Sequence, residues 1–228
     1  RGLRLHPAKV TQTLTVEELV AQLPNFDGWI IGDDPANRRV FEAGRAGRLR
    51  AAVKWGIGVD NVDFEACRDL GIPITNTPHM FGAEVADVAT AFTIGLARQL
   101  FLIDRGVRDG NWPKPAGISL TGRRAAVVGL GDIGRNTVTR LQALGLMVTA
   151  YDPGVDGDAG IPGLARAPWP DALEEQDFIV FTCALNRHNY HMLNAEVFDR
   201  CKEGVRIVNV ARGPLIDETA LIAALQSG

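Results

Sequence analysis

The feature that most constrains the fold is a glycine-rich turn at residues 129–134, Gly-Leu-Gly-Asp-Ile-Gly, which follows the apolar run 124–128. We interpret the apolar run as a buried strand and the turn as the start of a helix. Each glycine has a separate physical task in such a unit: Gly129 permits a tight turn, Gly131 lets the backbone approach a ligand, and Gly134 lets the helix pack close to the strand. The sequence therefore predicts a strand–turn–helix unit of a parallel α/β sheet.

An acidic residue after the next predicted strand indicates the class of ligand. Asp152 lies about 20 residues beyond the turn, where a carboxylate can accept hydrogen bonds from both hydroxyls of an adenosine ribose. The diphosphate of the same dinucleotide would bind at the helix N-terminus, where unpaired N–H groups and the helix dipole favour negative charge. Asp152 would repel a 2′-phosphate, so NAD is favoured over NADP. The predicted cofactor-binding residues of this region are Gly129, Gly131, Asp132, Ile133, Gly134 and Asp152.

Composition argues against several other function classes. The chain has 228 residues, of which 46% are hydrophobic and 22% charged, and these are ordinary values for a soluble globular protein. A net charge of −3 gives no electrostatic reason to expect a nucleic-acid or membrane partner. No apolar run approaches the roughly 20 residues of a membrane span, and the N-terminal residues lack the apolar stretch of a secretory signal. The three cysteines form no CxxC pair, so we expect a reducing, cytoplasmic setting and no metal site.

Apolar and polar stretches alternate along the chain as they do when strands and helices follow one another. We predict strands at 28–32, 51–55, 72–75, 124–128, 146–152, 177–182 and 205–210, and helices at 64–71, 194–201 and 217–227. Asn194 is the expected N-cap of the second helix. A long apolar helix is predicted from Ala83 to Val107, and its composition indicates burial between two units. This alternation predicts an α/β fold with two units in series on parallel, doubly wound sheets.

Five motifs in order resemble the family of D-isomer-specific 2-hydroxyacid dehydrogenases, and among its members the phosphoglycerate-oxidising branch most closely. They are Lys-Trp-Gly-Ile-Gly-Val-Asp-Asn-Val-Asp at 54–63, Thr-Asn-Thr-Pro at 75–78, Glu-Val-Ala-Asp at 84–87, the glycine turn, and Asn-Val-Ala-Arg-Gly-Pro-Leu-Ile-Asp at 209–217. The resemblance implies two Rossmann-like domains with a cleft between them: a substrate-binding domain at 1–77 and an NAD-binding domain at 78–228. It also implies hydride transfer between NAD and a 2-hydroxy acid, and a homodimer supported by the long helix.

The same resemblance makes Arg212 the catalytic arginine. Arg212 follows the strand predicted at 205–210, at a carboxyl end where open α/β sheets bind ligands. A planar guanidinium can hold the carboxylate of a 2-keto acid in a bidentate pair and polarise its ketone. Two segments are expected to line the cofactor, namely Thr182, Cys183 and Ala184, and Val210, Ala211 and Arg212. The first segment differs from the family's His-x-Pro in two of three residue types, and Cys183 is interpreted as a small buried residue, not a reactive thiol.

On the substrate side, Gly56, Ile57 and Gly58 resemble the loop whose backbone N–H groups grip the substrate carboxylate. Lys54 stands where related enzymes often carry an arginine near the substrate phosphate, and it is either such a contact or an ordinary solvated lysine. Trp55 is larger than the residue expected there and would change the shape of the pocket, so the resemblance does not establish phosphoglycerate as the substrate. His79 is a candidate substrate-loop residue, whereas Asp60 and Asp63 are expected to cap a helix and stabilise the loop.

A general acid is the missing part of this mechanism. The family's histidine and the glutamate that orients it lie well downstream of the arginine, and this chain ends 16 residues after Arg212. We therefore expect the chain to be part of a longer enzyme, with both sheets incomplete. Two other functions stay open: an NAD-binding regulatory protein on the same fold, like the family's transcriptional corepressors, and oxidation of formate or phosphite.

Overall fold

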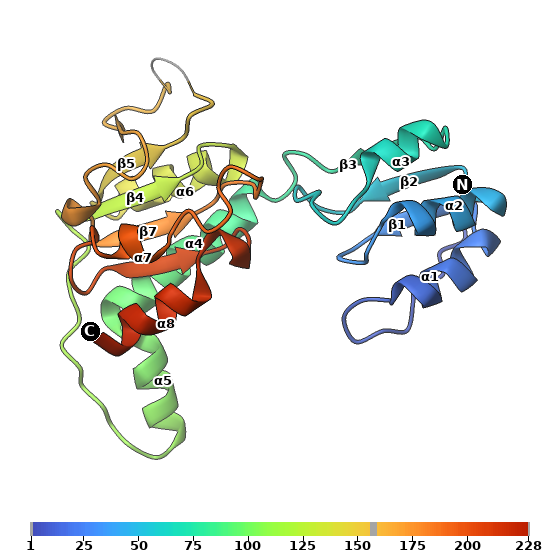
Figure 1. The fold of residues 1–228 in the computed structure, drawn as a ribbon. Helices are drawn as coiled ribbons and strands as arrows, with labels where there is room; N and C mark the ends of the chain where they lie inside the picture. Colours follow the sequence, from blue (N-terminus) through green and yellow to red (C-terminus); the bar gives the residue numbers. More distant parts are fainter. Residues whose placement is uncertain (1, 156–158, 228) are drawn as a thin grey trace. The chain divides into compact units, whose positions relative to one another are not determined.

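The computed structural model describes residues 2–155 and 159–227, and it divides into two compact units between Met80 and Phe81 (Figure 1). Each unit contains one parallel sheet with helices between its strands. This arrangement confirms the α/β class predicted from the alternation of apolar and polar stretches.

The first unit is built on three parallel strands, β1 (Gly28–Ile31), β2 (Ala51–Lys54) and β3 (Ile74–Asn76), in the order β1-β2-β3. Ile31 pairs with Lys54 and Lys54 with Asn76, so the carboxyl ends of all three strands lie at one edge of the sheet. The connecting helices are α1 (Val16–Gln22), the 3-10 turn η1 (Leu23–Asn25), α2 (Arg38–Ala46) and α3 (Phe64–Asp69). Buried side chains of all three α-helices join one core with the sheet.

The second unit is a five-stranded parallel sheet in the order β6-β5-β4-β7-β8. Its strands are β4 (Arg124–Val128), β5 (Met147–Tyr151), β6 (Ala165–Arg166), β7 (Phe178–Phe181) and β8 (Arg206–Asn209). Its helices are α4 (Gly82–Arg98), α5 (Leu100–Arg108), α6 (Asp132–Ala143), α7 (Ala195–Phe198) and α8 (Glu218–Ser227), with 3-10 turns η2 (Leu173–Glu175) and η3 (Gly213–Leu215).

Strand β4 is buried on both faces, as expected for the centre of a doubly wound sheet. Ala125 and Val127 join one core with residues of α4 and α6, whereas Ala126 and Val128 join a second core with residues of α7 and η3. The chain adds β5 on one side of β4 and β7 on the other, so the strand order reverses at β4. Ligands of such sheets bind outside the carboxyl ends of the strands at this reversal.

The prediction of one long buried helix from Ala83 to Val107 is wrong. The chain leaves α4 at Gln99, whose φ of 55° is left-handed, and α5 continues at an angle of 74° to α4. The aromatic ring of Phe101 folds back against Gly95, where a Cβ would lie 2.7 Å from it. Burial is also incomplete, because Phe92 on α4 is 44% exposed and no residue of α5 is buried.

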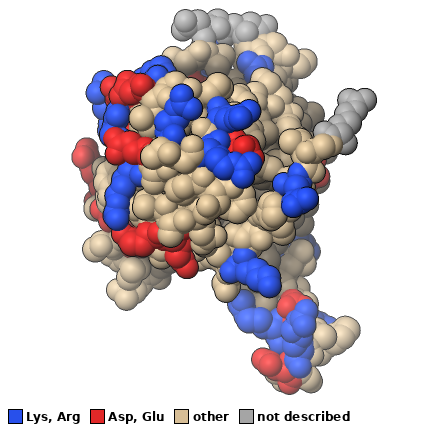
Figure 2. Space-filling view, turned by 90° about the vertical axis from the view of Figure 1, so that its right-hand side faces the viewer, with Lys and Arg blue, Asp and Glu red and all other residues tan. Residues whose placement is uncertain are grey.

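Smaller differences concern short elements and surface features. Strand β3 starts at Ile74, two residues later than predicted. The two-residue strand β6 is exposed and is not among the predicted strands. Helix α1 is not among the predicted helices, although it begins with a capping box of Thr15 and Glu18 and packs Leu19 into the core. Asn194 is the N-cap of α7, as predicted, and its side chain accepts the Val197 N–H at 3.2 Å. Within the described residues, no single helix is long and apolar enough to cross a membrane, although the bent pair α4–α5 reaches that length and composition. Figure 2 shows acidic and basic side chains intermixed over the visible face.

Candidate functional site

The candidate cofactor residues gather at one edge of the five-stranded sheet. In the parallel register Val128 pairs with Tyr151 and with Phe181, and Phe181 pairs with Asn209. The residues that follow these four positions therefore emerge together at the carboxyl ends of β4, β5, β7 and β8. They are Gly129, Asp152, Thr182 and Val210, so the structure brings together four candidate segments that are far apart in the sequence.

Two glycines of the turn are required by the local geometry. Gly129 has a φ of 96°, and a Cβ there would lie 2.6 Å from the Cα of Cys183. A Cβ on Gly134 would lie 2.0 Å from the carbonyl oxygen of Gly129. Real Cβ atoms do not approach other atoms this closely, so a side chain at either position would displace the turn. This agrees with the tight turn and the close helix–strand packing predicted for these two positions.

Gly131 differs from these two because the space around it is open. A Cβ at this position would have no atom within 4 Å, and Gly131 is the N-cap of α6 without a side-chain capping bond. The first N–H groups of a helix have no partner inside the helix. The N-terminus of α6 is therefore accessible to an anion, and the open backbone fits the diphosphate of a dinucleotide.

Asp132 turns its carboxylate toward the start of α4. A Cβ added to Gly82, the first residue of α4, would lie 2.3 Å from Oδ2 of Asp132. Oδ1 accepts a hydrogen bond from the Asn136 side chain at 3.2 Å, while Oδ2 is buried without a hydrogen-bond partner in the described structure. Asp132 therefore presents its backbone N–H to the open end of α6, as Ile133 does, and its side chain packs between helices.

Asp152 is attached directly to the glycine turn. Its Oδ2 accepts the Leu130 N–H at 2.6 Å, and its Oδ1 accepts the Gly154 N–H at 2.8 Å. These bonds hold the carboxylate next to the turn at the end of β5. An ionised carboxylate has about four lone-pair positions, so each oxygen keeps the capacity to accept a ribose hydroxyl.

The segment after β7 forms a wall of the turn. The Thr182 hydroxyl donates to the carbonyl oxygen of Gly129 at 2.8 Å, and the backbone of Cys183 is what a side chain on Gly129 would strike. The Asn189 side chain donates to the carbonyl of Ala184 at 2.8 Å and so fixes the end of the segment. Burial raises the pKa of the Cys183 thiol to about 11, so the thiol stays protonated near neutral pH and is a poor nucleophile.

Arg212 is positioned by a residue that the sequence reasoning missed. The Asn209 side chain accepts the Ala211 N–H at 2.9 Å and donates to the carbonyl of Arg212 at 2.9 Å. This short loop follows Val210, which extends the pairing of β8 by donating to the carbonyl of Phe181. The guanidinium of Arg212 donates to the Ala211 carbonyl at 3.0 Å. An asparagine at the end of a strand is a turn signal that could have indicated this role.

In the first unit, Lys54 is neither a solvated lysine nor a free cation. Its side chain is 3% exposed, and its ammonium donates to the carbonyl of Gly32 and forms an ion pair with Asp33 at 3.2 Å. Trp55 beside it is 56% exposed. The sequence reasoning did not single out Asp33, which lies two residues after the end of the edge strand β1. The carboxyl ends of parallel strands are a usual place for functional side chains.

The loop at 56–58 is held by the end of β3. Gly56 has a φ of 142°, and its N–H donates to the Thr77 hydroxyl at 2.9 Å. The Asn76 side chain donates to the carbonyl of Ile57 at 3.4 Å. Within the described ranges, the N–H groups of Ile57 and Gly58 have no acceptor. Two successive free N–H groups are the kind of donor set that binds a carboxylate.

The other expected residues on this side are placed as follows. Asp63 caps α3 by accepting the Ala66 N–H at 2.8 Å, which confirms the structural role predicted for it. Asn61 donates to the carbonyls of Gly32 and Asp34 at 3.0 and 2.8 Å and so holds the loop after β1. His79 is exposed and has a left-handed backbone with a φ of 61°.

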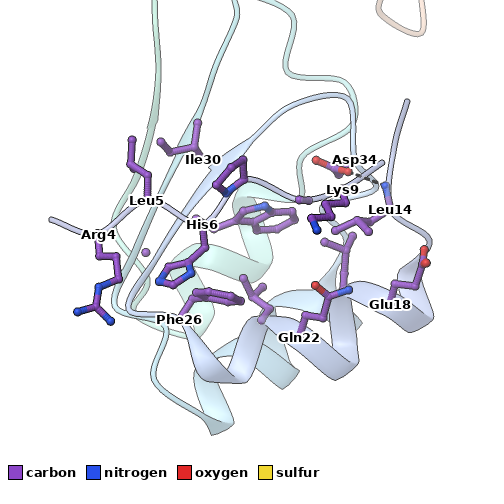
Figure 3. A pocket seen from close by; sticks show the side chains of 16 residues that line it. Arg4, Leu5, His6, Lys9, Leu14, Glu18, Gln22, Phe26, Ile30 and Asp34 are labelled. Carbon is purple, nitrogen blue, oxygen red and sulfur yellow. Dashed lines mark hydrogen bonds between the residues drawn. The ribbon is translucent and has the colours of Figure 1, made fainter. Parts of the chain in front are cut away.

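The first unit also has a cavity of about 740 Å³ that lies away from these residues. It is lined by residues 4–9, helix α1 and the edge strand β1 (Figure 3), and the ring of His6 lies 5.5 Å from that of Phe26. None of the predicted site residues lines it. Among the described residues, no three His, Cys, Asp or Glu side chains are grouped closely enough to hold a metal ion.

Comparison with known proteins agrees with this geometry. Residues 90–228 match the family model described as "D-isomer specific 2-hydroxyacid dehydrogenase, NAD binding domain". The D-3-phosphoglycerate dehydrogenase of Homo sapiens is 36% identical over 221 residues, which are 95% of this chain and 41% of that protein. The chloroplastic D-3-phosphoglycerate dehydrogenase 3 of Arabidopsis thaliana is 36% identical over 94% of this chain and 37% of that protein. The chain thus spans about two fifths of the length of these curated relatives.

Solved structures show the same fold. The apo D-lactate dehydrogenase of Escherichia coli is 30% identical, with a TM-score of 0.83 over 94% of this chain and 69% of that chain. A glyoxylate reductase from Paecilomyes thermophila is 27% identical, with a TM-score of 0.79 over 93% of this chain and 67% of that chain.

Proposed function

Since this chain belongs to the D-isomer specific 2-hydroxyacid dehydrogenase family and its residues 90–228 match the NAD-binding domain, we propose that it is part of an NAD-dependent oxidoreductase. The reaction is hydride transfer between the nicotinamide ring and the C2 atom of a D-2-hydroxy acid or 2-keto acid. The observation that supports it best is the hydrogen bond from the Leu130 N–H to Asp152, which holds this carboxylate beside the glycine turn.

The residues of this chain have separate tasks in that reaction. The open N-terminus of α6 binds the diphosphate, and Asp152 accepts the ribose hydroxyls. In the first unit, the N–H groups of Ile57 and Gly58 bind a substrate carboxylate. In the second unit, Arg212 serves as the catalytic arginine, whose guanidinium can polarise a ketone. The bound nicotinamide supplies or accepts the hydride. We propose that residues 1–77 serve the substrate and residues 78–228 the cofactor.

The identity of the acid is the finer part of the proposal. The curated relatives carry the name D-3-phosphoglycerate dehydrogenase, which makes 3-phosphoglycerate the first substrate to test. The names of the solved structures add D-lactate and glyoxylate, which have no phosphate. We also propose a homodimer, because α4 and α5 carry exposed apolar side chains that a second subunit would cover. A cytoplasmic location is proposed from the three free cysteines, which fit a reducing compartment.

Calorimetric titration of the full-length protein with NAD⁺ and NADP⁺ tests the cofactor site. Asp152→Ala is expected to weaken NAD⁺ binding by about 10- to 100-fold, the equivalent of one hydrogen bond to a charged group at about 1.5–3 kcal/mol. Asp199→Ala is the matched control, because Asp199 is an exposed aspartate elsewhere in the same unit. Equal NAD⁺ affinity in the wild type and Asp152→Ala would contradict the site. Reduction of 2-keto acids by NADH then separates an enzyme from an NAD-binding regulator.

A further inference from the structure

The charge balance around Lys54 bears on which acid the enzyme accepts, and this inference rests on the proposed function. The segments that follow the strand ends of the first unit are 32–35, 54–60 and 77–80. Their charged residues are Asp33, Asp34, Asp60 and Lys54. Three carboxylates and one ammonium give this edge a formal charge of −2, although the proposed substrate is an anion.

Lys54 lies next to the loop that binds the substrate carboxylate. A Cβ on Gly56 would lie 3.6 Å from Cε and 4.0 Å from Nζ of Lys54. The ammonium therefore lies beside this loop, and a second anionic group of a substrate held at Ile57 and Gly58 can reach it only by displacing the groups that bury it. Whether the Lys54 ammonium is free to form new hydrogen bonds decides whether a substrate phosphate is stabilised beside this loop.

The ammonium is already used within the protein. The Gly32 carbonyl and the Asp33 carboxylate accept its hydrogen bonds, and only 3% of the Lys54 side chain is exposed. Asp33 itself is 88% exposed, so its negative charge faces the solution from which the substrate comes. A phosphate would have to displace Asp33 from Lys54 and then remain within a few ångströms of that carboxylate. A Debye length of about 8 Å at physiological ionic strength leaves this repulsion largely unscreened.

We propose that Asp33 is a specificity-determining residue that neutralises Lys54 and directs the enzyme to 2-keto acids without a phosphate. A single carboxylate needs only the N–H groups of Ile57 and Gly58 on this unit. A substrate with an additional phosphate dianion meets the paired Lys54 and the net negative edge. The substrate class is therefore an unphosphorylated D-2-hydroxy acid, in contrast to the names of the curated relatives.

Hydroxypyruvate and 3-phosphohydroxypyruvate form a matched pair, because they differ by one phosphate. In the full-length protein with NADH, kcat/KM is expected to be higher for hydroxypyruvate. Asp33→Asn is expected to shift the ratio of the two kcat/KM values about tenfold toward the phosphorylated substrate, which corresponds to about 1.4 kcal/mol. The wild-type preference for hydroxypyruvate is expected to shrink as KCl is raised. A ratio measured on one variant is insensitive to partial loss of folded protein.

Two further variants make the result specific. Asp27→Asn removes another exposed aspartate of the first unit, which pairs with Arg48 at 2.6 Å, and should leave the ratio unchanged. Asp33→Asn combined with Lys54→Met should lose the shift, because the freed ammonium is what binds the phosphate. A wild-type preference for the phosphorylated substrate, or an unchanged ratio in Asp33→Asn, would overturn the inference.

A binding measurement separates this inference from the proposed function. Calorimetric titration of the NADH-loaded protein with D-glycerate and 3-phospho-D-glycerate, pairs in which no hydride can be transferred, gives two dissociation constants. Their ratio is the binding preference between the two acids. Tighter binding of 3-phospho-D-glycerate would overturn the role of Asp33 and leave the proposed dehydrogenase intact. Absence of both binding and turnover for either pair would overturn the proposed function, and the inference with it.

Discussion

Gly131 and Gly134 are three residues apart and have opposite surroundings, which makes them a test of the glycine turn. Gly134→Ala places a Cβ against the Gly129 carbonyl, and such overpacking costs about 1–3 kcal/mol of unfolding free energy. Gly131→Ala meets no atom within 4 Å, so the protein should keep its stability but bind NAD⁺ less tightly. Chemical denaturation and calorimetry on both variants check this. Loss of stability in Gly131→Ala, or none in Gly134→Ala, would contradict the geometry.

The thiol of Cys67 predicts how stability changes at high pH. Burial, and to a smaller extent the charge of Asp63, raises the pKa of Cys67 to about 11 from 9.0. As the pH rises, the thiol of the unfolded chain loses its proton before the buried thiol of the folded chain does. The contribution of Cys67 to the free energy of unfolding is therefore complete below pH 9 and is lost as the pH rises through 11. A two-unit shift corresponds to at most about 2.7 kcal/mol of unfolding free energy. Denaturation of Cys67→Ala between pH 8 and 11 should show a smaller decline than the wild type, and parallel curves would contradict the assignment.

Among the elements, the strands with apolar sequences could be predicted and the break between α4 and α5 could not. β4 and β7 are buried on both faces, and this requires the continuous apolar runs that the sequence displays. The break at Gln99 has no glycine or proline signal at its own position. It depends on the packing of Phe101 against Gly95, which is a contact between two helices.

Asp177 joins three strands at the amino end of the second sheet. Its carboxylate accepts hydrogen bonds from the Arg124 N–H at 3.0 Å and from Lys202 at 2.7 Å, and it pairs with Arg123 at 3.2 Å. Burial alone would raise the pKa of Asp177, but these bonds and charges hold it below its usual value. The stability that Asp177 contributes is therefore complete above about pH 4 and is lost as the pH falls further.

Asp177→Asn is expected to lower the free energy of unfolding by about 1–3 kcal/mol, since it leaves partners of a buried carboxylate incompletely satisfied. Asp171→Asn is a suitable control, because Asp171 is paired only at an exposed position, with Arg200 at 3.5 Å. Urea denaturation between pH 3 and 7 measures the free energy of unfolding of the wild type and of both variants. The difference between Asp177→Asn and the wild type should narrow at the acid end, and a constant difference would contradict the pKa argument.

Taken over the complete chain, the candidate site divides into a part that the sequence predicts and a part that it does not. Gly129, Gly134 and Asp152 belong to one strand–turn–helix–strand unit, so their spacing alone indicates their arrangement. The partner of Lys54 is 21 residues away on the neighbouring strand end, and only the sheet register brings Asp33 to it. The sequence therefore indicates Lys54 as a candidate contact, but it does not indicate that Asp33 is paired with the Lys54 ammonium.

The apolar face of α4 and α5 leads to a prediction about assembly. Helix α5 extends away from the sheet of its own unit (Figure 1), and none of its residues is buried. The exposed apolar side chains of the two helices are Val88, Phe92, Leu100, Phe101, Leu102 and Val107. Exposed large apolar side chains in such number on two neighbouring helices are typical of an interface, and obligate homodimer interfaces are the more apolar ones.

The full-length protein is therefore expected to sediment as a dimer at micromolar concentration. Phe92→Glu combined with Leu102→Glu should shift it to a monomer, because a dimer would have to bury both new charges without partners. Tyr190→Glu, at a side chain of the second unit that is 60% exposed, should leave the dimer intact. Circular dichroism shows whether each variant is folded. A wild type that sediments as a monomer would contradict the prediction, and a folded double variant that remains dimeric would place the interface on another face.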